Sequence, residues 1–343
     1  MHMTRSLLHS KVMEFCTKIG RDPLLVQGAG GNVSYKHDGE LWIKASGKWL
    51  ADADKIDIFV PVDLNSLKDA IGRNEFEEAP RLTQPSSSRA SIETMLHALM
   101  PHRIVTHVHA IEALVHLVSD DCEARLAERL GDFRDWVLVD YHKPGAPLAT
   151  AVSRKLAEAR DASVVFLQNH GVVVGGHTTD EVSALLGLLT ARLHSPVRQA
   201  AAIPVDKRAQ ELRELGGGYR RLQDSELEQL VFDEESYSRL SHSWALYPDH
   251  VVFLGPHALA YDSLQKSELL QPIENGRTYP IFIKGAGIFI TEAFNRAAHE
   301  QLRCYYDVVR RLPMGVQTRT LTVTDIAGLL NWDAERYRIE NAK

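Results

Sequence analysis

Helical and strand-like segments alternate along residues 91–195, and this alternation restricts the fold more than any other feature of the sequence. The helical segments are amphipathic, and the strand-like segments are short, apolar and rich in β-branched residues. Because elements of both kinds bury one face, they pack as helices against a sheet, and the pattern predicts a layered α/β fold. We expect helices at 91–100, 110–130, 147–160 and 179–194, and strands at 103–108, 136–140, 163–168 and 171–174.

The chain before residue 91 adds two helices and three strands to this pattern. The first helix has one apolar face and ends at Gly20. That face consists of Leu8, Val12, Phe15, Cys16 and Ile19. We expect strands at 32–36, 40–44 and 57–61, then a helix in DLNSLKDAI and a loop in PSSSRA.

Composition and charge exclude several classes of protein. The 343 residues are 44% hydrophobic and 24% charged, which allows a large core in two domains or one enlarged domain. A net charge of −6 without blocks of like charge argues against a nucleic-acid partner. No stretch approaches the ~18 apolar residues of a membrane helix and the first residues lack a signal peptide's apolar region, so we expect a cytoplasmic protein without a membrane partner. The widely spaced Cys16, Cys122 and Cys304 predict neither a disulfide framework nor a cysteine-ligated zinc.

A domain boundary is predicted at residues 196–220. Proline, charged residues and three consecutive glycines interrupt the hydrophobic periodicity there. We therefore expect a first domain at 1–198 and a C-terminal extension at 199–343.

One segment of the extension is similar in sequence to a segment of the first domain. PIFIKGAGIFITEAF resembles the earlier VVFLQNHGVVVGGHTTDEV, since both predict a strand, a glycine-containing turn, a strand and a helix opened by threonine. Phe282 and Gly287 then match Phe166 and Gly171, and Ala286 stands where the first copy has a histidine. The extension is therefore either a degenerate repeat of the first domain or similar to it by chance.

Two histidines in RIVTHVHAIEAL predict part of a metal site. The β-branched residues indicate a strand, and His107 and His109, two residues apart, share one of its faces. Zinc accepts neutral imidazoles but needs three or four ligands, and His170 in LQNHGVVVGG, at the end of another apolar strand, is the best third candidate. Ordinary packing is the alternative for the H-x-H pair. The other nearby histidines lack such pairing and are expected to be ordinary core or surface residues: His97, His102, His116 and His142.

Glu93 lies in the first predicted turn of the helix SIETMLHALM, with Ser91 near the cap. A carboxylate is favoured there by the helix dipole, so a capping role is one interpretation. In the other interpretation the carboxylate lies beside the metal, as a general base or as a fourth ligand that the substrate displaces.

Glycines in QGAGGNVSYK predict a concavity for an anion. The segment does not complete G-x-G-x-x-G and no G-K-[ST] follows, so it is neither a dinucleotide site nor a P-loop. Backbone N–H groups near Gly30 and Gly31 can still form an anion nest, although a tight turn between core elements is the alternative. The polar groups expected around the anion belong to Asn32, Ser46, Lys48 and Ser91.

Five of these motifs occur together in the class II aldolase/adducin family, which the sequence resembles over about residues 5–195. GAGGNVS, ASGKWL, S-I-E at a helix start, H-V-H and N-H-G follow one another with compatible spacing. The sequence is most similar to the aldolase portion of bifunctional rhamnulose-phosphate aldolase/dehydrogenase proteins, which share E-T-x-x-H-A-L-x-P-H. The resemblance implies a three-layer α-β-α fold whose central sheet is mixed, largely antiparallel and flanked by helices.

The resemblance also implies roles for individual residues. The residues at His107, His109 and His170 bind zinc in the family, and the one at Glu93 is both the acid/base and a resting metal ligand. Ala29 stands where the short aldolases usually have a hydroxyl residue, and no tyrosine is assigned as proton donor, so the sequence leaves phosphate specificity open. The family's phosphate pocket is matched by Asn32, Ser46, Gly47 and Ser91.

Together these residues predict a zinc-dependent aldolase, an aldehyde-lyase of carbohydrate metabolism that uses Zn²⁺ or another divalent metal. A zinc held by neutral histidines can chelate a substrate's hydroxyl and carbonyl oxygens and stabilise the enediolate left by retro-aldol cleavage, while Glu93 moves protons. The expected partner is a small molecule, a phosphorylated sugar or a related hydroxy-ketone, and the family implies a homo-oligomer, a tetramer or a dimer. The alternatives are a 4-epimerase, a decarboxylase and a metal-free adducin-like interaction module.

Overall fold

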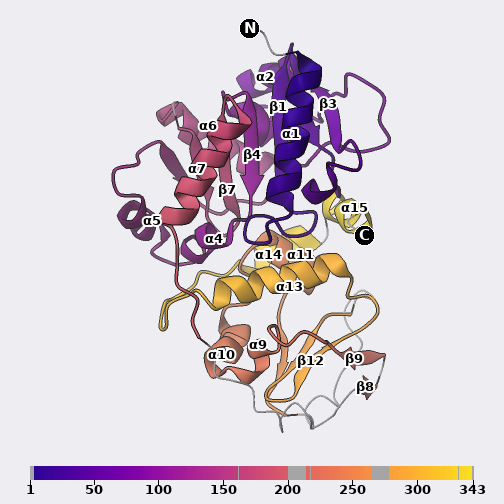
Figure 1. Ribbon diagram of the computed structural model, residues 1–343, viewed down its shortest axis with the longest axis vertical. Helices are drawn as coiled ribbons and strands as arrows, with labels where there is room; N and C mark the ends of the chain where they lie inside the picture. Colours follow the sequence, from indigo (N-terminus) through magenta and orange to yellow (C-terminus); the bar gives the residue numbers. More distant parts are fainter. Residues whose placement is uncertain are drawn as a thin grey trace. The chain divides into compact units, whose positions relative to one another are not determined.

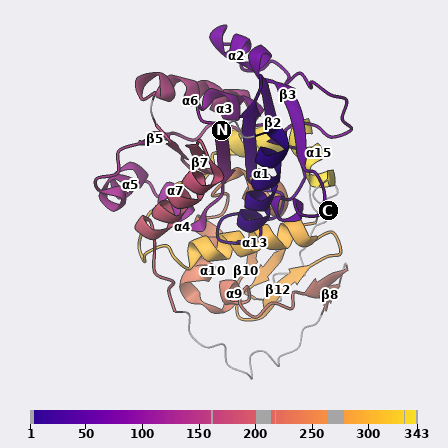
Figure 2. The same ribbon diagram turned by 45° about the horizontal axis from the view of Figure 1, so that its top comes forward.

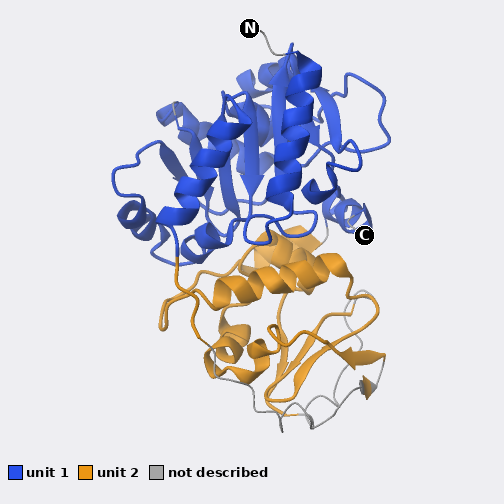
Figure 3. Cartoon of the chain, in the orientation of Figure 1, with its two compact units in different colours: residues 1–194, 331–342 blue, residues 195–330, 343 orange. Residues whose placement is uncertain are grey.

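The computed structural model describes residues 4–160, 162–199, 214–216, 218–263, 278–330 and 332–341. It contains two compact units, one formed by residues 1–194 with 331–342 and the other by residues 195–330 (Figure 3). The change of unit lies a few residues before the predicted domain end at 198. The last residues belong to the first unit and not to the extension in which the sequence analysis placed them.

A seven-stranded sheet forms the centre of the first unit (Figure 1). Its order is β3-β2-β1-β4-β7-β6-β5, and all neighbours are antiparallel except β5 and β6, which are parallel. The sheet is therefore mixed and largely antiparallel, as predicted. Its strands are β1 (Asn32–His37), β2 (Glu40–Lys44), β3 (Phe59–Asp63), β4 (Ile104–Val108), β5 (Trp136–Val139), β6 (Val164–Leu167) and β7 (Gly171–Gly176).

Helices cover both faces of this sheet and complete the three predicted layers. Helices α1 and α7 lie side by side on one face, and α2, α3 and α6 lie on the other (Figures 1 and 2). The helices of the unit are α1 (Arg5–Gly20), the short η1 (Leu50–Asp52), α2 (Leu64–Gly72), α3 (Thr94–Leu99), α4 (Ile111–Leu117), α5 (Cys122–Leu130), α6 (Ala146–Glu158), α7 (Thr179–Arg192) and α15 (Asp333–Asn341).

Successive side chains along each strand point to opposite faces of the sheet, so the core has separate clusters on the two faces. On β4, Ile104 and Val108 belong to the cluster that includes α1 and α7, whereas Val105 belongs to the cluster with α3 and α6. Because side chains two apart share a face, His107 lies on the side of Val105. Helix α1 buries the five apolar residues predicted for its inner face.

The second unit is built around a five-stranded sheet in the order β10-β11-β12-β9-β8. The prediction that Thr291 opens the helix after β12 is wrong, because Asn295 is its N-cap and accepts a hydrogen bond from the Ala298 amide at 3.0 Å. None of the described helices of either unit has the length and apolarity to cross a membrane. The elements are β8 (Glu214–Gly216), β9 (Tyr219–Arg221), α9 (Gln229–Phe232), α10 (Glu234–His242), α11 (Pro248–Leu254), β10 (Leu259–Tyr261), β11 (Ile281–Ile283), β12 (Gly287–Ile290), α13 (Arg296–Val309) and α14 (Val323–Leu330).

Candidate active site

Three buried histidines converge at one end of the central strands. His107 lies on β4, His109 directly follows that strand, and His170 lies in the turn between β6 and β7. One ring nitrogen of each lies within 4.8 Å of the others, and the Nε2 atoms of His107 and His109 are 3.1 Å apart. The antiparallel pairing of β4 with β7, which sets His107 opposite Val173, brings the turn with His170 beside the other two residues.

The carboxylate of Glu93, the residue just before α3, lies against this cluster. Its Oε2 lies 3.6 Å from Nε2 of His107 and its Oε1 lies 3.5 Å from Nε2 of His170. The Asn32 side chain donates a hydrogen bond to Oε2 at 2.7 Å, and Asn32 is also the β1 residue paired with His107. Glu93 precedes the first residue of α3, but its side chain makes no capping hydrogen bond. The carboxylate therefore belongs to the histidine cluster and not to the helix cap.

Glu93 is ionised although it is buried. Burial alone would raise its pKa, but His107, His170, the Asn32 hydrogen bond and His109 together outweigh burial and lower the pKa to about 2. The neighbouring His97 behaves in the opposite way, since burial lowers its pKa to about 3 and keeps it neutral. Its Nδ1 lies 2.8 Å from the Ser34 hydroxyl, so it is a hydrogen-bonded core residue, as expected from its unpaired position in the sequence.

The donor set of this cluster fits a divalent metal ion. Nδ1 of His107 lies 3.2 Å from the Val172 carbonyl, which can only accept, so Nδ1 carries a proton and Nε2 is the ring nitrogen that faces His109 and Glu93. Oε1 of Glu93 accepts no hydrogen bond from the described residues. Ring nitrogens and a carboxylate that converge in a buried space are a donor set suited to a divalent cation. Three imidazoles and a carboxylate are typical ligands of zinc.

The glycine loop before β1 packs closely against β4, the strand that carries His107. Gly31 has a φ of +62°, and a Cβ on it would lie 2.8 Å from the carbonyl oxygen of His107, so only glycine fits there without a shift of the backbone. The amide of Gly30 donates to the Gln27 carbonyl at 3.0 Å and is therefore engaged within the turn. The role of these glycines as an anion nest stays a prediction.

Two further loops with predicted phosphate ligands lie next to each other. The amide of Ser46 donates to the Arg89 carbonyl at 2.9 Å, which joins the turn containing Gly47 and Lys48 to the loop that precedes Ser91. The Ser91 hydroxyl accepts from the Glu93 amide at 3.2 Å. A ligand held by Ser91 would therefore lie close to the chain segment that carries the catalytic candidate.

Lys44 is a residue of this region that the sequence analysis did not identify. Its ammonium is buried and donates to the carbonyl of Ala29 at 2.9 Å and to that of Lys48 at 2.8 Å. It thereby ties the glycine loop to the turn after β2. A lysine in the predicted strand ELWIK was the available signal, since a buried charge must find polar partners.

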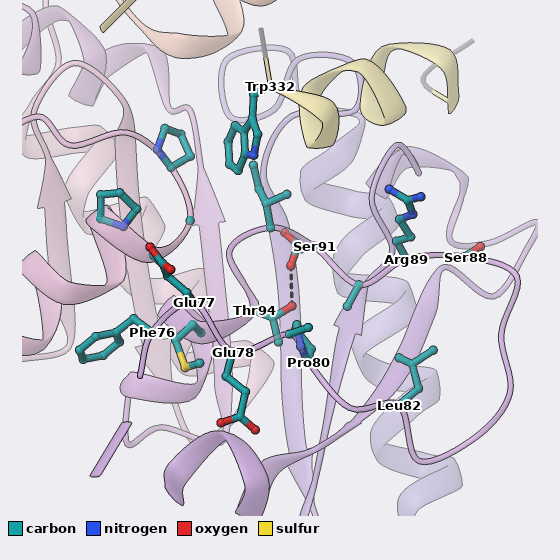
Figure 4. A pocket seen from close by; sticks show the side chains of 18 of the residues that line it. Phe76, Glu77, Glu78, Pro80, Leu82, Ser88, Arg89, Ser91, Thr94 and Trp332 are labelled. Atoms are coloured by element: carbon teal, nitrogen blue, oxygen red, sulfur yellow. Dashed lines mark hydrogen bonds between the residues drawn. The ribbon is translucent and has the colours of Figure 1, made fainter. Parts of the chain in front are cut away.

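A pocket of about 720 Å³ opens beside Ser91 (Figure 4). Residues 76–80, 82, 86–92, 94–95 and 143–147 line it together with Trp332, and Ser91 is the predicted site residue among them. The Lys143 ammonium lies 4.2 Å from the centroid of the Trp332 ring, a cation–π contact. Lys143 and Arg89, which also lines the pocket, make no ion pair within the described part of the chain.

The C-terminal segment supplies one wall of this region. After Trp332, Tyr337 on α15 stacks on the Arg89 guanidinium at 4.4 Å, and a Cβ on Gly47 would lie 2.6 Å from the Cβ of Asn341. Sequence analysis missed this wall, because nothing in the segment LLNWDAERYR shows that it packs against loops far away in the chain.

Comparison of the sequence with known proteins identifies one family. Residues 10–192, more than half of the chain, match the family described as Class II Aldolase and Adducin N-terminal domain. The curated protein "Uncharacterized oxidoreductase YuxG" of Bacillus subtilis (strain 168) is 29% identical over 178 residues, which are 47% of this chain and 25% of that protein. The chain thus matches about a quarter of the length of this relative.

Three of the solved structures similar to this chain illustrate the likeness. The N-terminal class II aldolase domain of a conserved Thermoplasma acidophilum protein has 26% identity and a TM-score of 0.48, and covers 56% of this chain and 94% of that one. YgbL of Klebsiella pneumoniae, a putative aldolase/epimerase/decarboxylase, has 19% identity and a TM-score of 0.42 over 63% and 97%. An L-fuculose 1-phosphate aldolase has 18% identity and a TM-score of 0.39 over 55% and 86%.

Proposed function

Because the chain belongs to the class II aldolase and adducin family, we propose that it is a zinc-dependent lyase that cleaves a sugar phosphate or a related hydroxy-ketone by retro-aldol chemistry. The observation that supports this proposal is the buried cluster in which Glu93 meets His107, His109 and His170. A divalent metal bound there supplies positive charge that polarises the substrate carbonyl and stabilises the charge left on carbon when the bond breaks.

The residues around the proposed metal position transfer protons and hold the side chains in place. The ionised Glu93 accepts the proton of the substrate hydroxyl when the carbon–carbon bond breaks, and returns a proton to the negatively charged carbon, which completes the carbonyl product. Asn32 holds Oε2 at 2.7 Å and so orients the carboxylate. The Val172 carbonyl holds His107 in the tautomer that exposes Nε2.

The surroundings of Ser91 supply the binding site for the rest of the substrate. We assign the phosphate to Ser91, Ser46, Gly47 and Lys48, in loops that the structure joins through the Ser46 amide, and to Asn32 at the start of β1. The neighbouring pocket, at about 720 Å³, is within the size range of small-ligand sites. Its lining combines the cations Arg89 and Lys143 with the carboxylates Glu77 and Glu78 and serine hydroxyls at 86–88, which suits a polyhydroxylated chain.

The test uses a half-reaction that needs only the ketone. A lyase of this kind removes an α-hydrogen from dihydroxyacetone phosphate, so in D₂O the protein should incorporate deuterium, which proton NMR detects. We expect exchange in the metal-loaded protein and none after chelation or in His107→Ala. His142→Ala, which changes an exposed histidine outside the cluster, is the matched control. A protein that binds zinc but neither exchanges hydrogen nor cleaves any ketose phosphate would contradict the proposal.

Product analysis separates the related reactions. A 4-epimerase returns a sugar phosphate with one inverted hydroxyl, a decarboxylase releases CO₂, and an adducin-like module binds no metal. We also propose a homo-oligomer, a tetramer or a dimer, because the family resemblance implies it. Light scattering that shows a monomer at working concentration would contradict that assembly. We propose a cytoplasmic location, which fits the three free cysteines.

A further inference from the structure

The sheet of the second unit has the same topology as the core of the first. In the first unit the strands β1-β4-β7-β6-β5 are neighbours in that order, and in the second unit β8-β9-β12-β11-β10 are neighbours in that order. In both units the first three pairs are antiparallel and the last pair is parallel. The corresponding strands also follow one another in the same order along the chain. In each unit a helix comes after the strand that is last in the chain, α7 after β7 and α13 after β12.

The central hairpins agree residue by residue. Phe166 pairs with Val172 in the first unit, and Phe282 pairs with Ile288 in the second. The turns close with equivalent hydrogen bonds, from the His170 amide to the Leu167 carbonyl at 3.1 Å and from the Ala286 amide to the Ile283 carbonyl at 3.0 Å. The middle residue of each turn has a positive φ, +53° for Asn169 and +69° for Gly285.

Two further hydrogen bonds of the turn recur. The amide of Gln168 donates to Val139 at the end of β5, and the amide of Lys284 donates to Tyr261 at the end of β10, both at 2.9 Å. The next amide donates to a helix in each unit. These bonds run from Asn169 to Leu117 at 3.2 Å and from Gly285 to Val231 at 2.8 Å. A chance likeness of two hairpins does not account for the same contacts to two other elements.

This correspondence puts Arg221 in the position of His107. His107 pairs with Val173 on β7, and Arg221 pairs with Phe289, the residue of β12 that matches Val173. Leu117 and Val231 follow His107 and Arg221 at the same distance along the chain. A Cβ on Gly171 would lie 3.1 Å from Cε1 of His107, and a Cβ on Gly287 would lie 2.8 Å from Nε of Arg221.

The remaining site residues are replaced or missing in the second unit. Gln223 and Ala286 stand at the positions of His109 and His170. Strands β8 and β9 follow each other directly, so the second unit lacks the segment that carries Glu93 between β1 and β4. The Arg221 guanidinium instead pairs with Glu228, with Nη2 2.6 Å and Nε 2.7 Å from its Oε1, and the two side chains are only 10% and 9% exposed.

We propose that the second unit is a copy of the catalytic core in which the Arg221–Glu228 ion pair occupies the position of the metal centre. The guanidinium supplies the positive charge that a metal supplies in the first unit, and it leaves no ligand for an ion. Among the described residues, the proposed metal site therefore lies in the first unit, and the second unit is a copy without it. The inference concerns the second unit and does not depend on the reaction that the first unit catalyses.

The test restores the ligands in the second unit. In a His107→Ala background, which removes a ligand of the first unit, the substitutions Arg221→His, Gln223→His and Ala286→His should create a site that binds about one equivalent of Co²⁺. Visible absorption of Co²⁺ and equilibrium dialysis measure this binding. The background with Arg221→Gln alone is the matched control and should bind none.

A second pair of variants tests whether Arg221 occupies the metal position. Gln223 is exposed and Ala286 is partly exposed, so both can be changed to histidine with Arg221 and Glu228 in place. The guanidinium should then prevent the two histidines from chelating Ni²⁺, and addition of Arg221→Gln should tighten Ni²⁺ binding at least about tenfold. Equal Ni²⁺ affinity with and without Arg221 overturns the proposal. A folded triple variant without Co²⁺ binding overturns it as well.

Discussion

Replacement of Glu93 by glutamine separates its proposed proton-transfer role from a structural one. Glutamine keeps the shape of the side chain, and its oxygen can still accept the Asn32 hydrogen bond that now reaches Oε2 at 2.7 Å. The charge and the proton-accepting oxygen are lost. The start of α3 should not change, because the Glu93 side chain makes no capping hydrogen bond and the bond between its amide and Ser91 remains.

These contacts set the size of the two effects. A general acid/base contributes about 10²–10⁴-fold to rate, so Glu93→Gln should slow deuterium incorporation into dihydroxyacetone phosphate by that factor. The corresponding increase in the activation free energy is about 2.7–5.5 kcal/mol. The free energy of unfolding should change by less than the ~1 kcal/mol that loss of a helix cap costs. NMR exchange measures the first quantity, and denaturant unfolding monitored by circular dichroism measures the second.

The control is Glu123→Gln, the same substitution at an exposed position in the first turn of α5. It should leave the exchange rate unchanged. A loss of less than ~10-fold in Glu93→Gln, with the metal retained, would refute the assignment of Glu93 as the base. A large loss of stability with an unchanged rate per folded molecule would return Glu93 to a structural role.

Three further predictions concern the metal, the phosphate and the second unit. Elemental analysis should find about one divalent ion per chain, most of it zinc, and His107→Ala should lose it; full retention in the variant would show that the ligand assignment is wrong. Lys48→Ala should raise KM for a phosphorylated substrate by roughly 10- to 150-fold, the effect of one charge-assisted hydrogen bond of about 1.5–3 kcal/mol. Equal competition by dihydroxyacetone and its phosphate in the wild type would argue against this pocket. Arg221→Met should lower the free energy of unfolding by about 3–5 kcal/mol because it leaves Glu228 buried without its partner, whereas Arg221→Met with Glu228→Met should cost much less; equal losses in chemical denaturation would contradict this.

The elements of the first unit could be predicted because local patterns specify them. The apolar face of α1 from Leu8 to Ile19 is read from a helical period, and β4 and β7 are read from runs of β-branched residues. The predicted ends of the helices and strands were less exact than their positions. Helix α3 begins at Thr94 and not at residue 91, because Glu93 still has a φ of −99° and a ψ of 15° before the helix.

The end of the chain could not be predicted in the same way. The place of the segment 332–341 beside Lys143, Arg89 and Gly47 depends on complementarity between surfaces that no local pattern encodes. The ion pair of Arg221 with Glu228 was also not predicted, because it depends on how α9, whose N-cap residue is Glu228, lies relative to β9.

The sequence by itself determined the layered α/β fold and the candidate ligands. His107 and His109 share one side because they are two residues apart on an extended segment, and His170 was recognised by its place at a strand end. Only the tertiary structure decided that these residues meet Glu93 and Asn32. That meeting depends on the register in which β1 and β7 pair with β4, and register is set by hydrogen bonds and packing between segments distant in the sequence, which a single sequence does not specify.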